Sequence, residues 1–171
     1  MEAQVVILSE RYRSALEHFS CSDAILNTYL QCYALQDQLA LKSICLLLVN
    51  PKHDIIGYIT LGTSSINATH FHYSSRKITK SPKGHHPVFV IKRLAIDIRF
   101  RGNGYGRHLL LAALKQAYNS SSSIGASAVF VYPNDGIPAK YYQKLGFIDL
   151  PNEQKLFLSM QQLHAMFLPF H

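Results

Sequence analysis

The chain has 171 residues, of which 48% are hydrophobic and 16% charged, and its net charge is +7. These values predict a single globular domain over residues 1–171 and exclude a disordered or fibrous protein. The longest aliphatic run, Ile44 to Val49, is too short to cross a bilayer, and the N-terminus lacks the pattern of a signal peptide. We therefore expect a cytoplasmic protein with no membrane partner.

Hydrophobic periodicity and turn residues predict seven strands and three helices. In chain order these are a strand at 5–8, a helix through 23–33, strands at 44–49, 55–61 and 87–97, a helix at 106–118, a strand at 126–132, a short helix opened by Pro138 and closed by Gly146, and strands at 147–150 and 155–160. Residues 67–86 are expected to form a long basic excursion between two strands.

The first predicted helix follows Ser20 and Asp23, which stand at capping-box spacing. Its apolar stripe is expected to contain Leu26, Leu30 and Tyr33, widened by Ile25 and Tyr29. In the second helix, Leu110, Leu114 and Ala117 share one face.

The segment Arg101-Gly102-Asn103-Gly104-Tyr105-Gly106 joins a predicted strand to the second helix. Glycines allow backbone N–H groups to converge into a concave nest, and the start of a helix adds N–H donors and partial positive charge. Arg101 and Arg107 add full charges, so the segment predicts a diphosphate-binding loop. It lacks the Gly-Lys-Ser/Thr of a P-loop. A dinucleotide fingerprint needs a wider glycine spacing within a parallel βαβ unit, whereas the strand before this loop follows strands that are expected to be antiparallel. The alternative is a glycine-rich turn without a ligand.

Two motifs carry a family resemblance. Ile91 to Leu114 resembles the acetyl-CoA motif of the GNAT superfamily of N-acetyltransferases, and Ala139 to Phe147 resembles its second signature, an aromatic–tyrosine pair that ends in Gly-Phe. The resemblance implies an α/β (α+β) GNAT fold, with a mixed, mostly antiparallel central sheet that is splayed in a V at the acetyl-CoA site and flanked by helices. It also implies acetyl-CoA as cosubstrate and no metal.

Other segments resemble the GNAT toxins of bacterial toxin–antitoxin systems, which acetylate aminoacyl-tRNA. These segments are Phe19–Cys21, Leu26–Leu30, Ala34–Asp37, Gly57–Leu61, Pro87–Val88 and Leu150–Pro151. The resemblance runs from Phe19 to Leu158 and implies a translation-blocking toxin that forms a homodimer and is neutralised by a ribbon-helix-helix antitoxin. The positive charge favours anionic partners, which include coenzyme A and nucleic acid, but many basic proteins bind neither.

The resemblance also assigns roles to single residues. Tyr142 matches the general acid that protonates the departing thiolate, the alternative being a packed helix aromatic. Asn134 is similar to an asparagine that other members use near coenzyme A, although it lies one residue further from Tyr142 than usual. The cofactor-binding residues implied are Leu94, Ala95, Ile96, Arg101, Gly102, Asn103, Gly104, Tyr105, Gly106, Arg107 and Asn134.

Several cations are candidates for contact with tRNA. Lys92 and Arg93 stand beside the cofactor motif, and the 67–86 segment either contacts the tRNA backbone through its lysines or is simply solvated. The set proposed for tRNA is Lys92, Arg93, Lys77, Lys80 and Lys83. His70, His72, His85 and His86 have no carboxylate or cysteine at ligand spacing, so we expect no metal site.

Two other functions stay open. One is a GNAT acetyltransferase of a small-molecule or protein amine, which predicts an acceptor pocket lined by acidic residues, although the whole chain contains only 10 Asp and Glu residues. The other is an inactive, CoA-binding corepressor partner of a DNA-binding antitoxin, against which the presence of Tyr142 argues.

Overall fold

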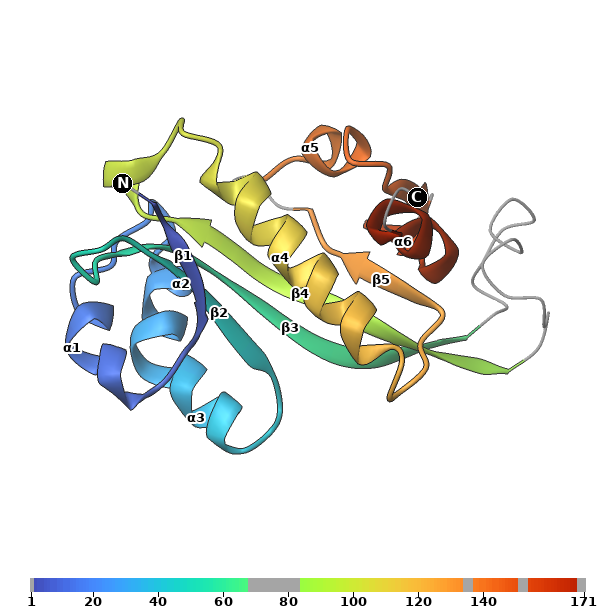
Figure 1. Ribbon diagram of the computed structural model, residues 1–171, viewed down its shortest axis with the longest axis horizontal. Helices are drawn as coiled ribbons and strands as arrows, with labels where there is room; N and C mark the ends of the chain where they lie inside the picture. Colours follow the sequence, from blue (N-terminus) through green and yellow to red (C-terminus); the bar gives the residue numbers. More distant parts are fainter. Residues whose placement is uncertain (1, 68–83, 134–136, 151–153, 169–171) are drawn as a thin grey trace. The chain divides into compact units, whose positions relative to one another are not determined.

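A computed structural model describes residues 2–67, 84–133, 137–150 and 154–168. Short helices follow the first strand, and the remaining strands and helices come after them (Figure 1). In order they are β1 (Gln4–Ile7), the 3-10 turn η1 (Glu10–Tyr12), α1 (Arg13–Leu16), α2 (Ala24–Thr28), the π-helical turn η2 (Tyr29–Tyr33), α3 (Ala34–Leu39), β2 (Ile44–Val49), β3 (Ile55–Asn67), β4 (His85–Ile96), the 3-10 turn η5 (Ile98–Phe100), α4 (Tyr105–Ser120), β5 (Ala128–Val131), α5 (Ala139–Gln143), β6 (Ile148–Leu150), β7 (Lys155–Ser159) and α6 (Met160–Phe167).

The seven strands are hydrogen-bonded in the order β1-β2-β3-β4-β5-β7-β6. The pairs β1–β2, β2–β3, β5–β7 and β6–β7 are antiparallel, whereas β4 and β5 are parallel. The mixed, mostly antiparallel sheet expected from the family resemblance is therefore confirmed. Because β4, α4 and β5 form a parallel crossover, it is the glycine spacing and not the strand direction that separates the loop from a dinucleotide fingerprint.

Two compact units can be distinguished, one of residues 1–62 and 92–113 and the other of residues 63–91 and 114–171. β3, β4 and α4 each contribute residues to both units, so the division does not coincide with a boundary in the chain. One domain over residues 1–171 stays a prediction.

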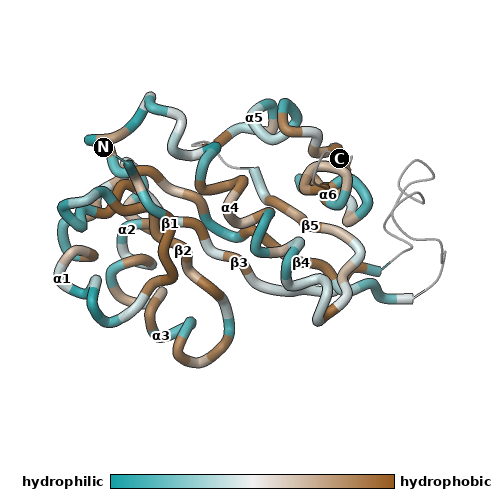
Figure 2. Tube along the Cα trace, viewed as in Figure 1, coloured by the Kyte–Doolittle hydropathy of each residue, from teal (hydrophilic) through white to brown (hydrophobic). Residues whose placement is uncertain are grey.

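In the first unit, the N-terminal helices pack on one face of β1, β2 and β3 (Figures 1 and 2). Cys45, Leu47 and Val49 alternate along β2 and point into this core, as the two-residue period of a strand requires. Tyr58 of β3 is completely buried, contacts the ring of Phe19 edge-on at 5.6 Å, and donates its hydroxyl to the Leu26 carbonyl at 2.8 Å.

In the second unit, alternate residues of β4, β5 and β7 form a separate apolar cluster. Val88, Val90, Phe130 and Phe157 belong to it, and the two phenylalanine rings lie 5.9 Å apart. α6 follows β7 through a capping box in which Ser159 and Gln162 satisfy each other's backbone N–H groups. Neither α6 nor the elements η1 and α1 were predicted from the sequence.

The predicted N-terminal helix differs in two ways from the structure. Its cap is Asp23, whose side chain accepts from the Ile25 and Leu26 N–H groups, and not the predicted pair of Ser20 with Asp23. The π-helical turn then adds a residue to one turn and changes the phase of the apolar stripe. Two residues of the predicted stripe are exposed: Ile25, which precedes the π-helical turn, by 79%, and Tyr33, at its end, by 55%. Among the described residues, no helix is long and apolar enough to span a membrane.

Candidate functional site

The loop after β4 contains two glycines in the left-handed region of backbone space. Gly102 has φ +79° and Gly104 has φ +77°, and a Cβ built on either would meet no atom within 4 Å. Glycine is therefore required here by conformation and not by lack of space. The Asn103 amide stabilises the loop by donating to the carbonyl oxygens of Phe100 (3.0 Å) and Arg101 (3.1 Å).

α4 begins directly after this loop. The His108 N–H donates to the Gly104 carbonyl at 3.2 Å. The N–H groups of Tyr105, Gly106 and Arg107 precede that first helical hydrogen bond and have no acceptor within the helix. Together with the positive end of the helix dipole, these groups favour a bound anion.

An open hollow of about 590 Å³ lies beside the start of α4. It combines basic side chains with apolar ones, being lined by Gly104, Arg107, His108, Leu111 and Ala112. Arg101 is also exposed, and its guanidinium donates to the Ser22 hydroxyl at 2.8 Å. This mixture suits an elongated ligand that has both anionic and apolar parts.

β4 pairs with β5 over only part of its length. The described pairing joins Val88–Ile91 to Ala128–Val131, and Leu94, Ala95 and Ile96 follow beyond its last pair. The described pairing with β5 therefore ends before the residues of β4 that lead to the glycine loop. A strand edge without a neighbour presents N–H and C=O groups that a ligand can bind.

Successive residues of β4 direct their backbone N–H and C=O groups to opposite edges of the strand. The Asp97 N–H donates to the Ile56 carbonyl at 2.8 Å, and a Cβ on Gly57 would lie 2.7 Å from the Ala95 carbonyl oxygen. The polar groups of Ala95 and Asp97 therefore face β3, and the groups of Leu94 and Ile96 face the opposite edge. Of the three residues predicted to hold the cofactor's arm, Leu94 and Ile96 are the better placed.

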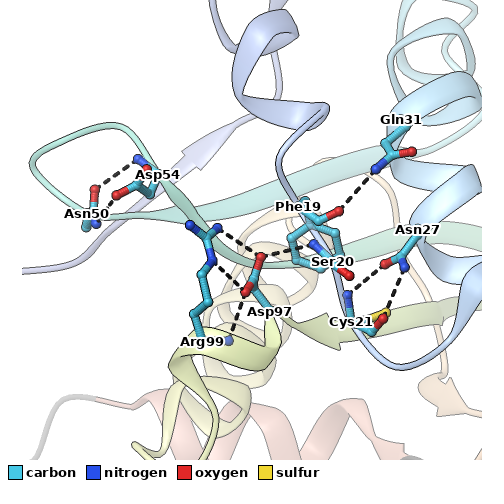
Figure 3. A network of polar contacts seen from close by, with 9 residues as sticks. All are labelled: Phe19, Ser20, Cys21, Asn27, Gln31, Asn50, Asp54, Asp97 and Arg99. Carbon is cyan, nitrogen blue, oxygen red and sulfur yellow. Dashed lines mark hydrogen bonds and ion pairs between the residues drawn. The ribbon is translucent and has the colours of Figure 1, made fainter.

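Asp97 connects the end of β4 to the segment that precedes α2 (Figure 3). Its side chain is fully buried and accepts from the Ser20 N–H at 3.0 Å and from the Arg99 guanidinium at 2.9 and 3.0 Å. Burial alone would raise the pKa of Asp97, but the hydrogen bonds from Arg99 and from the Ser20 N–H outweigh it and hold that pKa below its ordinary value. The carboxylate is thus charged near neutral pH. A structural role for Asp97 was not predicted from the sequence.

Tyr142 of α5 is buried in the second unit, with 3% of its surface exposed. Its ring contacts those of Tyr141 and Phe147 edge-on, at 5.6 and 5.7 Å. Burial, with a smaller contribution from Tyr141, raises the pKa of Tyr142 to about 12. The phenol therefore keeps its proton throughout the neutral range, which a proton donor requires.

A second pocket, of about 400 Å³, lies where the π-helical turn meets β4. The Arg93 guanidinium stacks 3.5 Å from the centroid of the Tyr29 ring, and the Tyr29 hydroxyl donates to Asp37 at 2.8 Å. The pocket is lined by Ala24, Ile25, Thr28, Tyr29, Tyr33 and Arg93. Among these lining residues Arg93 is the only charged one, so the pocket offers apolar and aromatic surface around a cation.

Of the remaining residues predicted to bind tRNA or coenzyme A, only Lys92 lies within the described part of the chain. Lys92 is exposed, and its side chain passes 3.5 Å from the position of a Cβ on Gly62. Asn134, Lys77, Lys80 and Lys83 lie outside the described residues, as do His70 and His72. Within the described part of the chain, no three His, Cys, Asp or Glu side chains form a group that could hold a metal ion.

The apolar and aromatic lining of the pocket beside Arg93 was also not predicted from the sequence. Helical spacing predicts a buried stripe that includes Ile25, Tyr29 and Tyr33. Of these three residues, only Tyr29 is buried. A π-helical turn has no sequence signature comparable to a glycine motif, so the phase change could not be read in advance.

The fold and the loop are those of an acyl-CoA-binding transferase, and comparison with known families agrees. Residues 41–149, more than half of the chain, match the model of the acetyltransferase (GNAT) domain. The chain belongs to this family.

Known relatives extend the similarity to nearly the whole chain. A tRNA-acetylating toxin of Mycobacterium tuberculosis is 26% identical over 149 residues, which cover 86% of this chain and 87% of that protein. The structure of AtaT complexed with acetyl-methionyl-tRNAfMet is 26% identical with a TM-score of 0.85, over 98% of this chain and 100% of that one. A variant of KacT has a TM-score of 0.87 at 23% identity over 98% and 100% of the two chains, which shows a shared fold.

Proposed function

We propose that this chain is an acetyl-CoA-dependent N-acetyltransferase that acetylates the α-amino group of an aminoacyl-tRNA, and that it acts in the cytoplasm as the translation-blocking toxin of a toxin–antitoxin system. The observation that carries the proposal is the end-to-end similarity to a tRNA-acetylating toxin and to AtaT, which has a solved structure in complex with acetyl-methionyl-tRNAfMet. The net charge of +7 supports an anionic macromolecular substrate.

The two sides of the reaction have separate binding surfaces in this proposal. The diphosphate of acetyl-CoA binds the loop Arg101–Gly106, the start of α4 and Arg107, and the pantetheine arm binds the free edge of β4 at Leu94 and Ile96. The thioester carbonyl is polarised by a backbone N–H on that edge. The tRNA 3′ end enters the pocket beside Arg93, where an aromatic ring and a guanidinium suit stacking against a base. Lys92 and, beyond the described residues, Asn134, Lys77, Lys80 and Lys83 are further proposed contacts.

The chemistry follows from these groups. The neutral amine attacks the thioester carbonyl, a C–N bond forms and the C–S bond breaks, and the proton released by the nitrogen balances the one taken up by the thiolate. The pKa of Tyr142, at about 12, lies above the ordinary thiol value of roughly 8.5. A hydrogen bond from the phenol to the thiolate is therefore favoured over full ionisation of Tyr142.

The pocket beside Arg93 distinguishes the proposal from acetylation of a small amine or protein amine. A lysine-like acceptor carries positive charge and would be attracted by carboxylates, yet none of the lining residues is acidic and one is an arginine. The α-amine of an aminoacyl ester is less basic than a lysine side chain and needs little help to be neutral.

The direct test is incubation of the protein with a mixture of charged tRNAs and labelled acetyl-CoA. We expect label on the aminoacyl group of one or more tRNAs and none on uncharged tRNA. Label on no tRNA would contradict the proposal, and label on polyamines or proteins instead would favour the second function.

Two partners belong to the same proposal. The family resemblance implies a homodimer and a ribbon-helix-helix antitoxin, and solved structures of AtaT include its complex with the antitoxin AtaR. Sedimentation of the purified protein tests the first. Co-expression with candidate ribbon-helix-helix proteins tests the second, because a cognate antitoxin should restore growth. If the chain were only a CoA-binding corepressor, it would bind DNA with that partner but transfer no acetyl group.

A further inference from the structure

A third hollow of the first unit is a basic pocket that shares no residue with the loop or with the pocket beside Arg93. Its volume is about 480 Å³, and three separate segments contribute its polar lining. The charged and polar residues that line it include Arg11, Ser14, His18, Lys52, His53, Asp54 and Arg99. Three of the lining side chains are fixed cations, and Asp54 is the one carboxylate among them.

Two of the three fixed cations in this pocket have no carboxylate as an ion-pair partner among the described residues. Arg99 is paired with buried Asp97, but neither Arg11 nor Lys52 has an ion-pair partner among the described residues. Arg11 instead lies over the ring of Tyr12, 5.0 Å from its centroid. Arg13, two residues along the chain, is by contrast paired with Glu10 at 2.7 Å and does not line the pocket.

The turn that supplies Lys52 and His53 is held in place from within. The Asn50 side-chain oxygen accepts from the Lys52 N–H at 2.9 Å. It also accepts from the Asp54 N–H at 2.9 Å, and the Asn50 amide donates to the Asp54 carboxylate at 2.9 Å (Figure 3). His53 adopts φ +64°, in the left-handed region that residues other than glycine seldom occupy. The turn therefore projects its two basic side chains from a fixed backbone.

We propose that this basic pocket binds a backbone phosphate of the tRNA substrate, away from the reacting 3′ end. The inference rests on the proposed function. Lysine, arginine, hydroxyl and imidazole groups are common partners of phosphate oxygens, and such contacts position a nucleic acid without reading its sequence. The pocket adds a contact drawn from the described residues to those proposed for the 67–86 segment.

The test is equilibrium binding of one unmodified tRNA at several salt concentrations. The double variant Arg11→Ala/Lys52→Ala removes two unpaired cations, so the tRNA dissociation constant should rise about tenfold or more near physiological salt, and the salt slope of log K should fall by about 2. The charge-preserving variant Arg11→Lys/Lys52→Arg should bind as the parent does. Arg13→Ala is the matched control, because it removes an exposed arginine already paired with Glu10.

Acetyl transfer provides the second readout. In the Arg11→Ala/Lys52→Ala variant, KM for charged tRNA should rise with kcat unchanged, and acetylation of an aminoacyl-adenosine, which has no backbone phosphate, should be unaffected. Equal tRNA affinity and equal salt slope in this variant and the parent would overturn the inference. Weaker neutralisation by the antitoxin with unchanged tRNA binding would also overturn it, and would assign the pocket to an acidic protein segment.

The two proposals can fail separately. If the parent protein labels no charged tRNA, yet its binding of tRNA still depends on Arg11 and Lys52, the proposed function is wrong and the phosphate pocket stands. If the parent acetylates charged tRNA and these substitutions change nothing, only the pocket is wrong.

Discussion

The loop Arg101–Gly106 and the helical segment Ala24–Leu39 belong to the same compact unit, but they present different chemical groups. The loop presents its backbone, because two left-handed glycines and the start of α4 leave N–H groups available. The helical segment presents side chains, because Ile25 of α2 and Tyr33 at the end of the π-helical turn are exposed and line the pocket beside Arg93. A cofactor common to a family can be bound by backbone groups, whereas an acceptor is distinguished by side chains.

A residue outside both regions gives the largest expected effect. Tyr142→Phe removes the phenol that is proposed to donate a hydrogen bond to the departing thiolate, and it should lower kcat about 100-fold or more. KM for acetyl-CoA and for charged tRNA should not change, because neither binding surface is altered. Steady-state kinetics and thermal unfolding check this, with Tyr141→Phe as the neighbouring control. An unchanged kcat would show that proton donation comes from elsewhere.

The helical segment should separate stability from acceptor binding. Leu30 is fully buried, so Leu30→Ala should lower the free energy of unfolding by about 2–5 kcal/mol. Ile25→Ala, at a side chain that is 79% exposed, should change it by less than about 0.5 kcal/mol. It should instead raise KM for charged tRNA. Denaturant unfolding and steady-state kinetics on both variants test these expectations. An unstable Ile25→Ala protein would contradict the exposed position of Ile25 on the helix.

The backbone character of the cofactor side can be tested with one added methyl group. A Cβ on Gly57 would lie 2.5 Å from Ile96 Cδ1 and 2.7 Å from the Ala95 carbonyl oxygen. Gly57→Ala should therefore displace the end of β4, destabilise the fold by about 1–3 kcal/mol and raise KM for acetyl-CoA. At Gly62 the nearest atom is 3.5 Å away, so Gly62→Ala is the matched control. Equal behaviour of the two variants would refute a close approach of β3 and β4.

The last effect is on stability alone, and it is expected at Asp97, whose carboxylate joins the segment before α2 to the end of β4. Asp97→Asn should lower stability at neutral pH by about 1–3 kcal/mol, because a charged acceptor of several hydrogen bonds is lost. The folded-state pKa of Asp97 is lowered, so the carboxylate stabilises the fold above its ordinary pKa of about 3.9, and this contribution disappears as pH falls through the lowered value. Urea unfolding from pH 7 to 3 should therefore show the two proteins converging in acid. An exposed control, Glu10→Gln, should change stability less.

The sequence predicted those features that depend on the spacing of nearby residues, such as the buried face of a regular helix. The buried face of Leu110, Leu114 and Ala117 follows from helical spacing, and each is fully buried. The pocket beside Arg93 could not be predicted, because it depends on one irregular turn of helix. α6 was missed for another reason: the apolar run of β7 continues into Met160, although the Ser159–Gln162 capping box is visible in the sequence.

The hydrogen bond from Ser20 to Asp97 joins residues that are 77 positions apart. Protein synthesis proceeds from the N-terminus, so the ribosome has made all of α2, η2 and α3 well before it adds the carboxylate that anchors the segment in front of them. Contacts of such sequence separation form late, because a long loop must close first. The acceptor surface of a nascent chain is thus fixed in position only after β4 has been synthesised.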